Sequence, residues 1–429
     1  MARDPRAAAA RAVAAVLAGR SLDAVLNPAS AAVVARDRGF VAELAYGTLR
    51  IAPRLQALLA LLLERPLRDR DRDLEALLLV GLYQLADTRV PDHAAVAATV
   101  GAAGALGKGW ARGLANAVLR RYRREQATLE AALPAAAKAA HPPWLYRALQ
   151  QEWREHAPGI LAAGNGRPPM TLRVNIRRRR RADYLSALAA AGIEARAGTL
   201  APEAVYIADP RPVDELPGFT GGEVSVQDEA AQLAAGLLAP GPGARVLDTC
   251  AAPGGKACHL LEYAACELTA VDVDGQRLRR VEDNLARLGL AARIACGDAA
   301  AAATLAGDAP WDRVLVDAPC SGSGVLRRHP DIKVLRHADD PPRLAARQRA
   351  ILDTCWARLK PGGRLLYVTC SLLASENDGV VGPFLATHRD AGECTPAQPG
   401  ALRLRHGIQV LPAAAGPDGL YFALLEKAA

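Results

Sequence analysis

Residues 246–256 read VLDTCAAPGGK, an apolar strand that runs directly into a turn with two adjacent glycines. Glycine has no Cβ, so Gly254 and Gly255 let the backbone approach a ligand closely. Ligands of open α/β sheets bind at the carboxyl ends of the strands, and the first strand-to-helix turn often carries the binding loop. This stretch therefore predicts a ligand-binding α/β domain whose first strand ends at residue 249.

Further apolar segments follow this loop and alternate with helical stretches. The predicted strands cover residues 245–249, 268–273, 293–296, 313–317 and 364–369, and residues 276–288 form the clearest helix. This alternation predicts a parallel, doubly wound sheet with helices on both faces. In a sheet of order 3-2-1-4-5, the fourth and fifth strands are neighbours about 4.8 Å apart.

The loop differs from two common phosphate-binding motifs. A P-loop needs glycine at position 250 and Ser or Thr at position 257, where this chain has Cys250 and Ala257, and a dinucleotide fingerprint needs a third glycine. Asp272 ends the second strand, where a carboxylate can hold a ribose diol. Asp298 follows the third strand, where it can accept a hydrogen bond from an adenine amino group. We therefore expect S-adenosylmethionine as the cofactor, and no metal.

Two of the eight cysteines follow successive predicted strands. Cys320 lies in DAPCSG (317–322) after the fourth strand, and Cys370 lies in TCS (369–371) after the fifth. Because these strands are neighbours, we expect both thiols at the same edge of the cofactor pocket. We expect the other six cysteines to fill the core, since free cysteine is among the most buried residue types.

A thiol beside a methyl donor favours methylation of a carbon atom. C5 of cytosine has no lone pair, but a thiolate that adds to C6 turns C5 into a nucleophilic enamine carbon. A base then removes the C5 proton and the enzyme is eliminated. Asp317 is a candidate for contacting N3 of the ring. An amino-directed methyltransferase more often has (Asp/Asn)-Pro-Pro-aromatic after the fourth strand, a pattern that Ala318 and Cys320 break.

The N-terminal region differs in composition from the rest of the chain. Residues 1–125 hold 19 Lys and Arg against 12 Asp and Glu, so +7 of the net charge of +8 lies there. This excess favours a polyanionic partner, although a solvated helical surface would also carry it. Apolar residues recur three and four apart, which predicts an all-α bundle of six or seven helices.

The sequence predicts a cytoplasmic protein without a membrane anchor. The apolar run 55–63 is far shorter than the roughly 18 residues that a membrane span needs. Residues 1–20 lack the apolar core of a signal peptide. No pair of cysteines has C-x-x-C spacing, which indicates reduced thiols rather than a zinc site.

Several longer motifs resemble those of the Sun/RsmB family of ribosomal RNA cytosine-5 methyltransferases, within the wider Nop2/NSUN group. They are CAAPGGK (250–256), VDVD (271–274), VDAPCSGSGVLRRHPDIK (316–333), TCS (369–371) and DGLYFALLEK (418–427). In the helical region, ELAYGTLR (43–50) and GLANAVLR (113–120) resemble NusB, an RNA-binding antitermination factor. The resemblance covers almost the whole chain, and DAPCSG together with TCS is its most specific part.

The resemblance implies a fold and a division into domains. A NusB-like all-α RNA-binding domain (1–125) and a helical linker (126–165) would precede a small α+β RNA-binding subdomain (166–222). A Rossmann-like class I S-adenosylmethionine methyltransferase domain (223–429) would follow. The implied reaction is methylation of C5 of a specific cytosine in small-subunit (16S) ribosomal RNA, and we expect a monomer.

The resemblance also implies roles for site residues. Cys370 would be the nucleophile and Cys320 would help to release the methylated base, an order that the residues alone leave open. Ala257 stands where the family often has Thr or Ser, which puts a hydroxyl contact in doubt. The cofactor pocket would be lined by Cys250, Ala251, Ala252, Pro253, Gly254, Gly255, Lys256, Asp272, Asp298 and Asp317.

Three questions stay open at this point. A transfer RNA cytosine-5 methyltransferase would share every catalytic residue, and the NusB-like region favours ribosomal RNA only by analogy. A non-catalytic RNA-binding assembly factor is disfavoured by the intact cysteines and glycine loop. The run Arg177, Arg178, Arg179, Arg180 and Arg181 fits additional phosphate contacts and an arginine-rich composition equally well.

Overall fold

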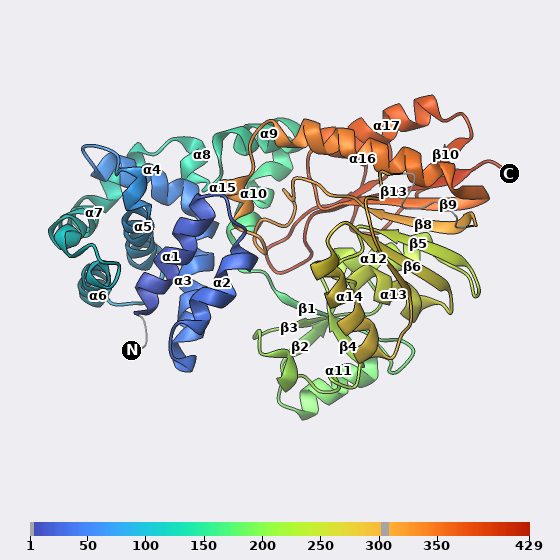
Figure 1. The fold of residues 1–429 in the computed structure, drawn as a ribbon, viewed down its shortest axis with the longest axis horizontal. Coiled ribbons are helices and arrows are strands. Elements are labelled where there is room, and N and C mark those ends of the chain that lie inside the picture. The colour runs from blue at the N-terminus through green and yellow to red at the C-terminus, as the bar shows by residue number, and fades with distance from the viewer. Residues whose placement is uncertain (1–3, 302–308) are drawn as a thin grey trace. The chain divides into compact units, whose positions relative to one another are not determined.

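The computed structural model describes residues 4–301 and 309–429 of the 429-residue chain (Figure 1). Within that part, no helix is both long enough and apolar enough to cross a membrane. The architecture is an all-helical part, a small antiparallel sheet with one helix, and a large mixed α/β sheet. It confirms the predicted fold class.

The chain forms two compact units. One comprises Met1–Gly166 and Leu326–Ala338, and the other comprises Arg167–Val325 and Asp339–Ala429. This division does not decide the four domain ranges expected from the sequence, which stay a prediction.

The first unit is all-helical. Asp4 caps its first helix by accepting hydrogen bonds from the backbone N–H groups of Arg6 (2.8 Å) and Ala7 (3.0 Å). Leu, Val and Ala side chains three and four residues apart are buried in one core. Among the described residues, seven α-helices begin before residue 125, as predicted. The helices are α1 (Pro5–Leu17), α2 (Leu22–Ala31), α3 (Arg38–Arg50), α4 (Ala52–Leu62), α5 (Arg72–Asp87), α6 (Asp92–Ala105), α7 (Arg112–Ala132), α8 (Ala135–Lys138), α9 (Pro143–Trp153) and α10 (Ala157–Asn165).

The segment Leu326–Ala338 belongs to this helical unit, although only Val325 separates it from the DAPCSGSG motif of the second unit. Its short helix α15 (Ile332–Leu335), orange in Figure 1, lies among the blue helices. The buried Lys333 Nζ donates hydrogen bonds to the carbonyls of Arg50 (2.8 Å) and Ala140 (3.1 Å). Burial, and to a smaller degree the charge of Arg50, holds the pKa of Lys333 well below its usual range. Through these bonds, the segment Leu326–Ala338 stabilises the helical unit.

The second unit contains a small four-stranded antiparallel sheet of order β2-β3-β1-β4. Its strands are β1 (Met170–Val174), β2 (Ala195–Ala197), β3 (Ala204–Ile207) and β4 (Val224–Val226). Helix α11 (Arg181–Ala190) covers one face through Tyr184 and Leu188, which are fully buried. These elements confirm the small α+β subdomain of the predicted fold class.

The large sheet of the second unit is mixed. Its order is β11-β12-β13-β9-β8-β5-β6-β7, with β10 beside β13. The five strands β7-β6-β5-β8-β9 are parallel neighbours, which confirms the predicted order 3-2-1-4-5. The bounds are β5 (Arg245–Thr249), β6 (Glu267–Asp272), β7 (Arg293–Cys296), β8 (Trp311–Asp317), β9 (Leu359–Thr369), β10 (Ala391–Glu393), β11 (Leu402–Arg403), β12 (Ile408–Val410) and β13 (Leu420–Lys427).

The prediction of a sheet that is parallel throughout is wrong at one edge. Strand β13 runs antiparallel to β9, with Tyr421 opposite Thr369. An apolar strand buried on both faces carries no alternation that reveals its direction. The DGLYFALLEK motif therefore adds an antiparallel strand beside the strand that ends at Cys370.

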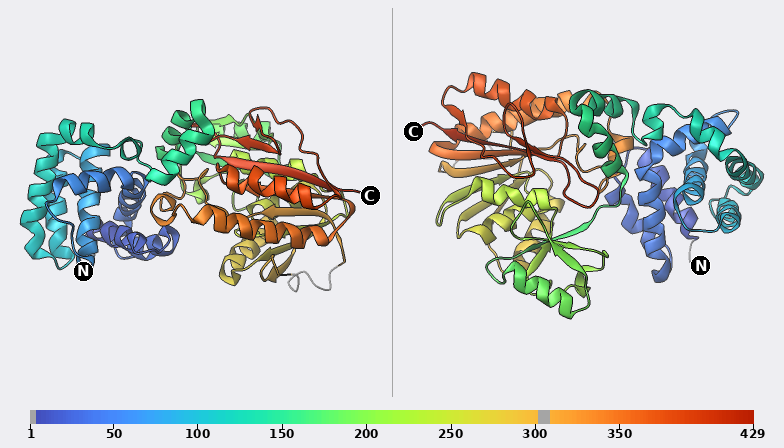
Figure 2. Two further views of the ribbon diagram at one scale, coloured as in Figure 1. Left: turned by 90° about the horizontal axis from the view of Figure 1, so that it is seen from above. Right: turned by 180° about the vertical axis from the view of Figure 1, so that it is seen from behind.

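Helices cover both faces of the large sheet, as the two views in Figure 2 show. On one face, α12 (Glu229–Leu238), α13 (Gly255–Tyr263) and α14 (Gly275–Leu288) pack against Val246, Leu315 and Val368. On the other face, α16 (Asp340–Ala357) and α17 (Asp378–Thr387) pack against Leu247 and Tyr367. Both faces of each central strand are thus buried, and the carboxyl ends of the strands stay at one edge.

Candidate active site

The glycine-rich loop connects β5 to α13 at the carboxyl edge of the sheet. Gly254 has φ of +100°, and a Cβ added there would lie 3.1 Å from the Cα of Val281. Only glycine suits both the conformation and the space. The carboxylate of Asp272 accepts hydrogen bonds from the N–H groups of Ala252 (3.1 Å) and Asp274 (3.0 Å). In this structure, Asp272 therefore holds the glycine-rich loop in place.

A pocket lies beside this loop. Asp298 borders it, and its Oδ1 accepts a hydrogen bond from the Arg347 guanidinium at 3.1 Å. Val273 also lines the pocket and is 61% exposed. Sequence reasoning missed Arg347, Arg277, Val273 and Ile351 as pocket residues. The lining residues are Cys250, Asp272, Val273, Arg277, Gly297, Asp298, Ala299, Pro319, Arg347 and Ile351.

The buried carboxylate of Asp248 indicates whether this site suits a cationic cofactor. Asp248, at the end of β5, is completely buried, and neither carboxylate oxygen has a hydrogen-bond partner within the described residues. Burial, followed by the nearby charge of Asp317, raises its pKa well above the usual range. S-adenosylmethionine carries a sulfonium and an ammonium group, and either would stabilise this carboxylate. The residues present therefore fit that cofactor.

From the sequence, Asp248 was predicted only as part of the strand 245–249. No local sequence pattern indicates that its carboxylate is buried without a hydrogen-bond partner. Across residues 4–301 and 309–429, no group of three or more His, Cys, Asp or Glu side chains could hold a metal ion.

An ion pair joins the glycine loop to the DAPCSG motif. The Lys256 ammonium lies 2.7 Å from Oδ2 of Asp317, and the Lys256 side chain is 15% exposed. Burial disfavours the ammonium, but Asp317 and, more weakly, Cys370 outweigh this effect and leave the pKa of Lys256 above its usual range. Lys256 is thus a fixed positive charge near the Cys370 thiol.

The two cysteines that follow β8 and β9 meet. Their Sγ atoms lie 3.2 Å apart. The loops are tied by hydrogen bonds from the Ala318 N–H to the Val368 carbonyl and from the Gly324 N–H to the Cys370 carbonyl, both 2.9 Å. The strand order alone predicts this meeting, because adjacent parallel strands place their carboxyl ends together.

The environments of the two thiols differ. Cys320 is buried, whereas Cys370 is half-buried. The hydrogen bond to Cys370 raises the pKa of Cys320 well above its usual range, and burial and the charges of Cys370 and Glu376 add to the shift. Cys320 therefore stays protonated, and the Cys370 sulfur lies beside it and near the Lys256 ammonium.

The expectation that the remaining cysteines fill the core is only partly met. Cys258 and Cys355 are buried, and burial raises the pKa of Cys258 to about 11. Cys296 and Cys394 are exposed. Cys250 has a pKa raised to about 12, by burial and by the neighbouring carboxylates of the cofactor pocket. Thiols with raised pKa values are poor nucleophiles at neutral pH.

The five consecutive arginines are bound within the second unit. Arg177 and Arg178 donate to the carbonyls of Leu261 (3.1 Å) and Leu288 (2.8 Å), near the ends of α13 and α14. The remaining three bond to Glu223, to Asp183, and to the carbonyls of Gly198 and Ala201. Their hydrogen bonds give the run a structural role that neither of the two sequence-based explanations included.

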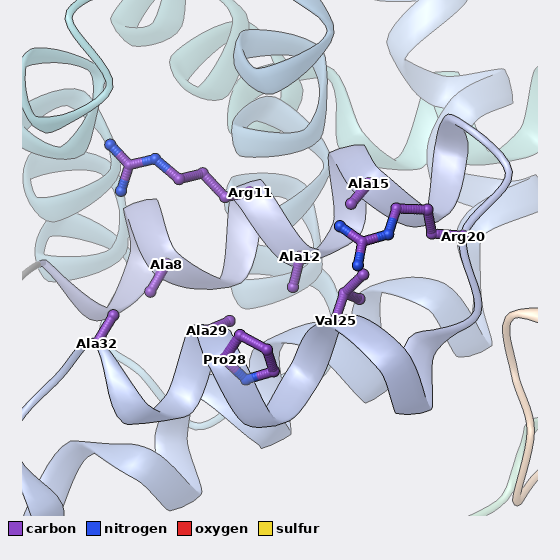
Figure 3. Close-up of a pocket in the computed structure, with 9 residues that line it drawn as sticks. All are labelled: Ala8, Arg11, Ala12, Ala15, Arg20, Val25, Pro28, Ala29 and Ala32. Carbon is purple, nitrogen blue, oxygen red and sulfur yellow. The ribbon is translucent and has the colours of Figure 1, made fainter. Parts of the chain in front are cut away.

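The helical unit carries two surface hollows bordered by arginines. Arg11 and Arg20 lie at opposite ends of a groove between α1 and α2 whose other lining residues are small or apolar (Figure 3). A larger groove between α6 and α7 is bordered by Arg120, Arg123 and Arg124. Such surfaces suit a polyanion.

Comparisons with known proteins identify the family. Three family models match: the NusB family over residues 3–124, an RsmF/B-like ferredoxin-like domain over 141–214, and 16S rRNA methyltransferase RsmB/F over 235–426. A crystallised methyltransferase homolog protein from Pyrococcus horikoshii is 26% identical, with a TM-score of 0.60, and covers 68% of this chain and 97% of its own. NSun6 from the same organism shares the fold at 21% identity and a TM-score of 0.58, covering 67% and 98%.

Relatives match the chain from end to end. It is 50% identical to ribosomal RNA small subunit methyltransferase B of Pseudomonas putida, over 99% of both chains. It is 45% identical to the protein of that name from Vibrio cholerae, over 98% of this chain and 97% of the relative. The chain therefore belongs to the ribosomal RNA small subunit methyltransferase B family.

Proposed function

We propose that the chain transfers a methyl group from S-adenosylmethionine to C5 of a cytosine in small-subunit (16S) ribosomal RNA, with Cys370 as the nucleophile. The observation that carries this proposal is the 3.2 Å separation of the Cys320 and Cys370 Sγ atoms beside the glycine-rich loop. Two adjacent thiols, one near a fixed ammonium and one held protonated, match a reaction in which a thiolate adds and later leaves.

The residues around the pocket would hold the cofactor. Asp248 and the Gly254 loop would bind its charged end, and Asp272 and Asp298 would accept hydrogen bonds from the hydroxyl and amino groups of an adenosyl moiety. When bound, S-adenosylmethionine supplies a methyl group on a positively charged sulfur. Arg347 already contacts Asp298, so it would share that carboxylate or move aside.

Cys370 would begin the reaction on the base. Its thiolate adds to C6, the C5–C6 double bond opens, and its electrons make C5 the nucleophile that accepts the methyl group. The Lys256 ammonium stabilises the thiolate before the addition. The carboxylate of Asp317, held by Lys256 at 2.7 Å, would accept a hydrogen bond from the amino group of the ring, and from N3 while that nitrogen carries a proton taken from water on addition and returned on release.

Cys320 would act when the base leaves. A base takes the C5 proton, the C5–C6 double bond re-forms, and the Cys370 sulfur departs as a thiolate. The Cys320 thiol lies 3.2 Å from that sulfur and can donate a hydrogen bond to it. This arrangement supports the order of roles implied by the family resemblance.

Ribosomal RNA is the substrate favoured by the relatives, whose names specify the small ribosomal subunit. The arginine-bordered grooves of the helical unit would contact phosphates. The experiment incubates the purified chain with labelled S-adenosylmethionine and 16S RNA that lacks the modification. Bisulfite sequencing should then show one protected cytosine in reactions with wild type and none with Cys370→Ala. Label at an amino or ribose position would overturn the proposal.

A further inference from the structure

A buried carboxylate joins the two cysteine loops. Glu376 ends the short turn Ala374–Glu376 after β9 and is 0% exposed. Its Oε1 accepts hydrogen bonds from the Ser321 N–H (2.8 Å) and the Gln348 side chain (3.3 Å). Its Oε2 accepts hydrogen bonds from the hydroxyls of Ser321 (2.5 Å) and Ser371 (2.6 Å). Each of these serines directly follows one of the two reacting cysteines.

The neighbouring residue, Asn377, binds the residues on both sides of Cys370. Asn377 accepts a hydrogen bond from the Thr369 hydroxyl (2.6 Å) and donates one to the Ser371 carbonyl (3.0 Å). The residues before and after Cys370 are therefore both fixed by the Glu376-Asn377 pair. The Tyr367 hydroxyl also donates to the Glu376 carbonyl at 2.7 Å, which secures the turn to β9.

Burial of the Glu376 carboxylate is not explained by a gain in the stability of the fold. A carboxylate loses several kcal/mol of hydration on full burial, and an apolar side chain of similar size would avoid that cost. Within the described residues, no Lys, Arg or His forms an ion pair with Glu376, and its partners are neutral donors. A fully satisfied network of this kind makes the groups that it joins rigid.

We propose that Glu376 is a positioning residue that holds the Cys320 and Cys370 thiols at their reacting separation by bridging Ser321 and Ser371. The role of Glu376 in catalysis rests on the proposed function. Its effect on the distance between the two thiols does not depend on that function. The same carboxylate, by its charge, contributes to the raised pKa of Cys320. Glu376 thus affects both the distance between the thiols and which of them keeps its proton.

The distance is tested by disulfide closure, which needs no RNA. Diamide, an azo compound, takes two electrons and two protons from a pair of thiols as the S–S bond forms. Mass spectrometry of peptides measures how fast the Cys320–Cys370 disulfide appears. A misplacement of about 1 Å costs on the order of 100-fold for reactions between positioned groups, so we expect a loss of that size in Glu376→Ala.

Two further variants control the measurement. Glu229 is a second buried carboxylate, 1% exposed, that accepts hydrogen bonds from Leu200, Ala201 and Tyr206, away from the cysteine loops. Glu229→Ala should close the disulfide at the wild-type rate. Glu376→Gln keeps one acceptor for the Ser321 N–H and should restore most of the rate. Its missing charge should move the alkylation of Cys320 to lower pH.

The outcomes separate the alternatives. Wild-type closure in Glu376→Ala overturns the proposal, as does equal slowing in Glu229→Ala. If Glu376→Ala does not fold, the double variant Ser321→Ala with Ser371→Ala, which removes both hydroxyls that Glu376 bridges, takes its place, and wild-type closure in that variant overturns the proposal. Slow closure in Glu376→Ala, together with a wild type that transfers no methyl group to RNA, would support the positioning role and refute the proposed function. In an active enzyme, Glu376→Ala should lower kcat and leave the KM for S-adenosylmethionine unchanged.

Discussion

Replacing Asp248 with asparagine should change stability and cofactor affinity in opposite directions. The substitution Asp248→Asn keeps the size of the side chain and removes a charge that is completely buried without a hydrogen-bond partner in the described part of the chain. Asparagine cannot ionise, so the free energy of unfolding should rise at neutral pH by about 1.4 kcal/mol for each pH unit that separates the unfolded pKa of Asp248 from its folded pKa, or from the pH of the measurement where that is lower. Urea unfolding of the cofactor-free protein measures it.

The gain in stability should depend on pH. Because burial raises the folded-state pKa of Asp248, the carboxylate destabilises the fold most when the pH lies above that folded pKa. As the pH falls toward the unfolded value of about 3.9, the wild-type side chain becomes protonated and the difference between the two proteins disappears.

Cofactor binding should weaken in the same variant. A hydrogen bond to a charged group contributes roughly 1.5–3 kcal/mol, which corresponds to a roughly 10- to 150-fold higher Kd for S-adenosylmethionine by calorimetry. The control is Asp312→Asn, since the Asp312 carboxylate pairs with Lys360 (2.6 Å) and accepts from the Arg245 N–H (2.9 Å). That change should lower stability and leave the Kd unchanged. A less stable Asp248→Asn protein, or one with wild-type affinity, would refute the reasoning.

Three further changes test other parts of the account. Arg120→Ala with Arg124→Ala should lower the slope of log Kd for RNA against log salt by about 1–2, and an unchanged slope would exclude the α6–α7 groove as an RNA contact. Lys333→Met should lower the free energy of unfolding of the helical unit by about 1–3 kcal/mol, because the Arg50 and Ala140 carbonyls lose a buried donor; an unchanged urea midpoint would contradict this. Cys355→Ala, which alters a buried thiol whose pKa burial raises, should cost about 1 kcal/mol and leave methyl transfer intact. Loss of methyl transfer in a folded Cys355→Ala protein would contradict the assignment of Cys320 and Cys370 as the reacting cysteines.

The sequence predicts the central sheet well because each of its strands is a short apolar run that ends in polar residues. The bounds of β5 and β7 match the prediction, and β8 and β9 begin two and five residues earlier, at Trp311 and Leu359. The early start of β9 was missed because Pro361, Gly362 and Gly363 usually interrupt a strand.

Long-range contacts explain what the sequence could not predict. Residues 326–338 come soon after the DAPCSGSG motif of the second unit yet fold with the helical unit, and no local sequence pattern predicts that change of unit. The roles of Asp248 and Glu376 depend on long-range partners: the fold brings Ser321 and Gln348 to Glu376, and it leaves Asp248 without a hydrogen-bond partner among the described residues. By contrast, the meeting of Cys320 and Cys370 was predictable, because it follows from the order of the strands.

The covalent bond to RNA is the central claim, and trapping it tests that claim most directly. Cys320→Ala should attack and methylate the base but release it slowly, because the departing Cys370 sulfur loses the hydrogen-bond donor at 3.2 Å. Denaturing electrophoresis of this variant with labelled RNA and S-adenosylmethionine should show a stable protein–RNA adduct, and mass spectrometry should place the bond at Cys370. An adduct from Cys370→Ala instead, or from neither variant, would contradict the account.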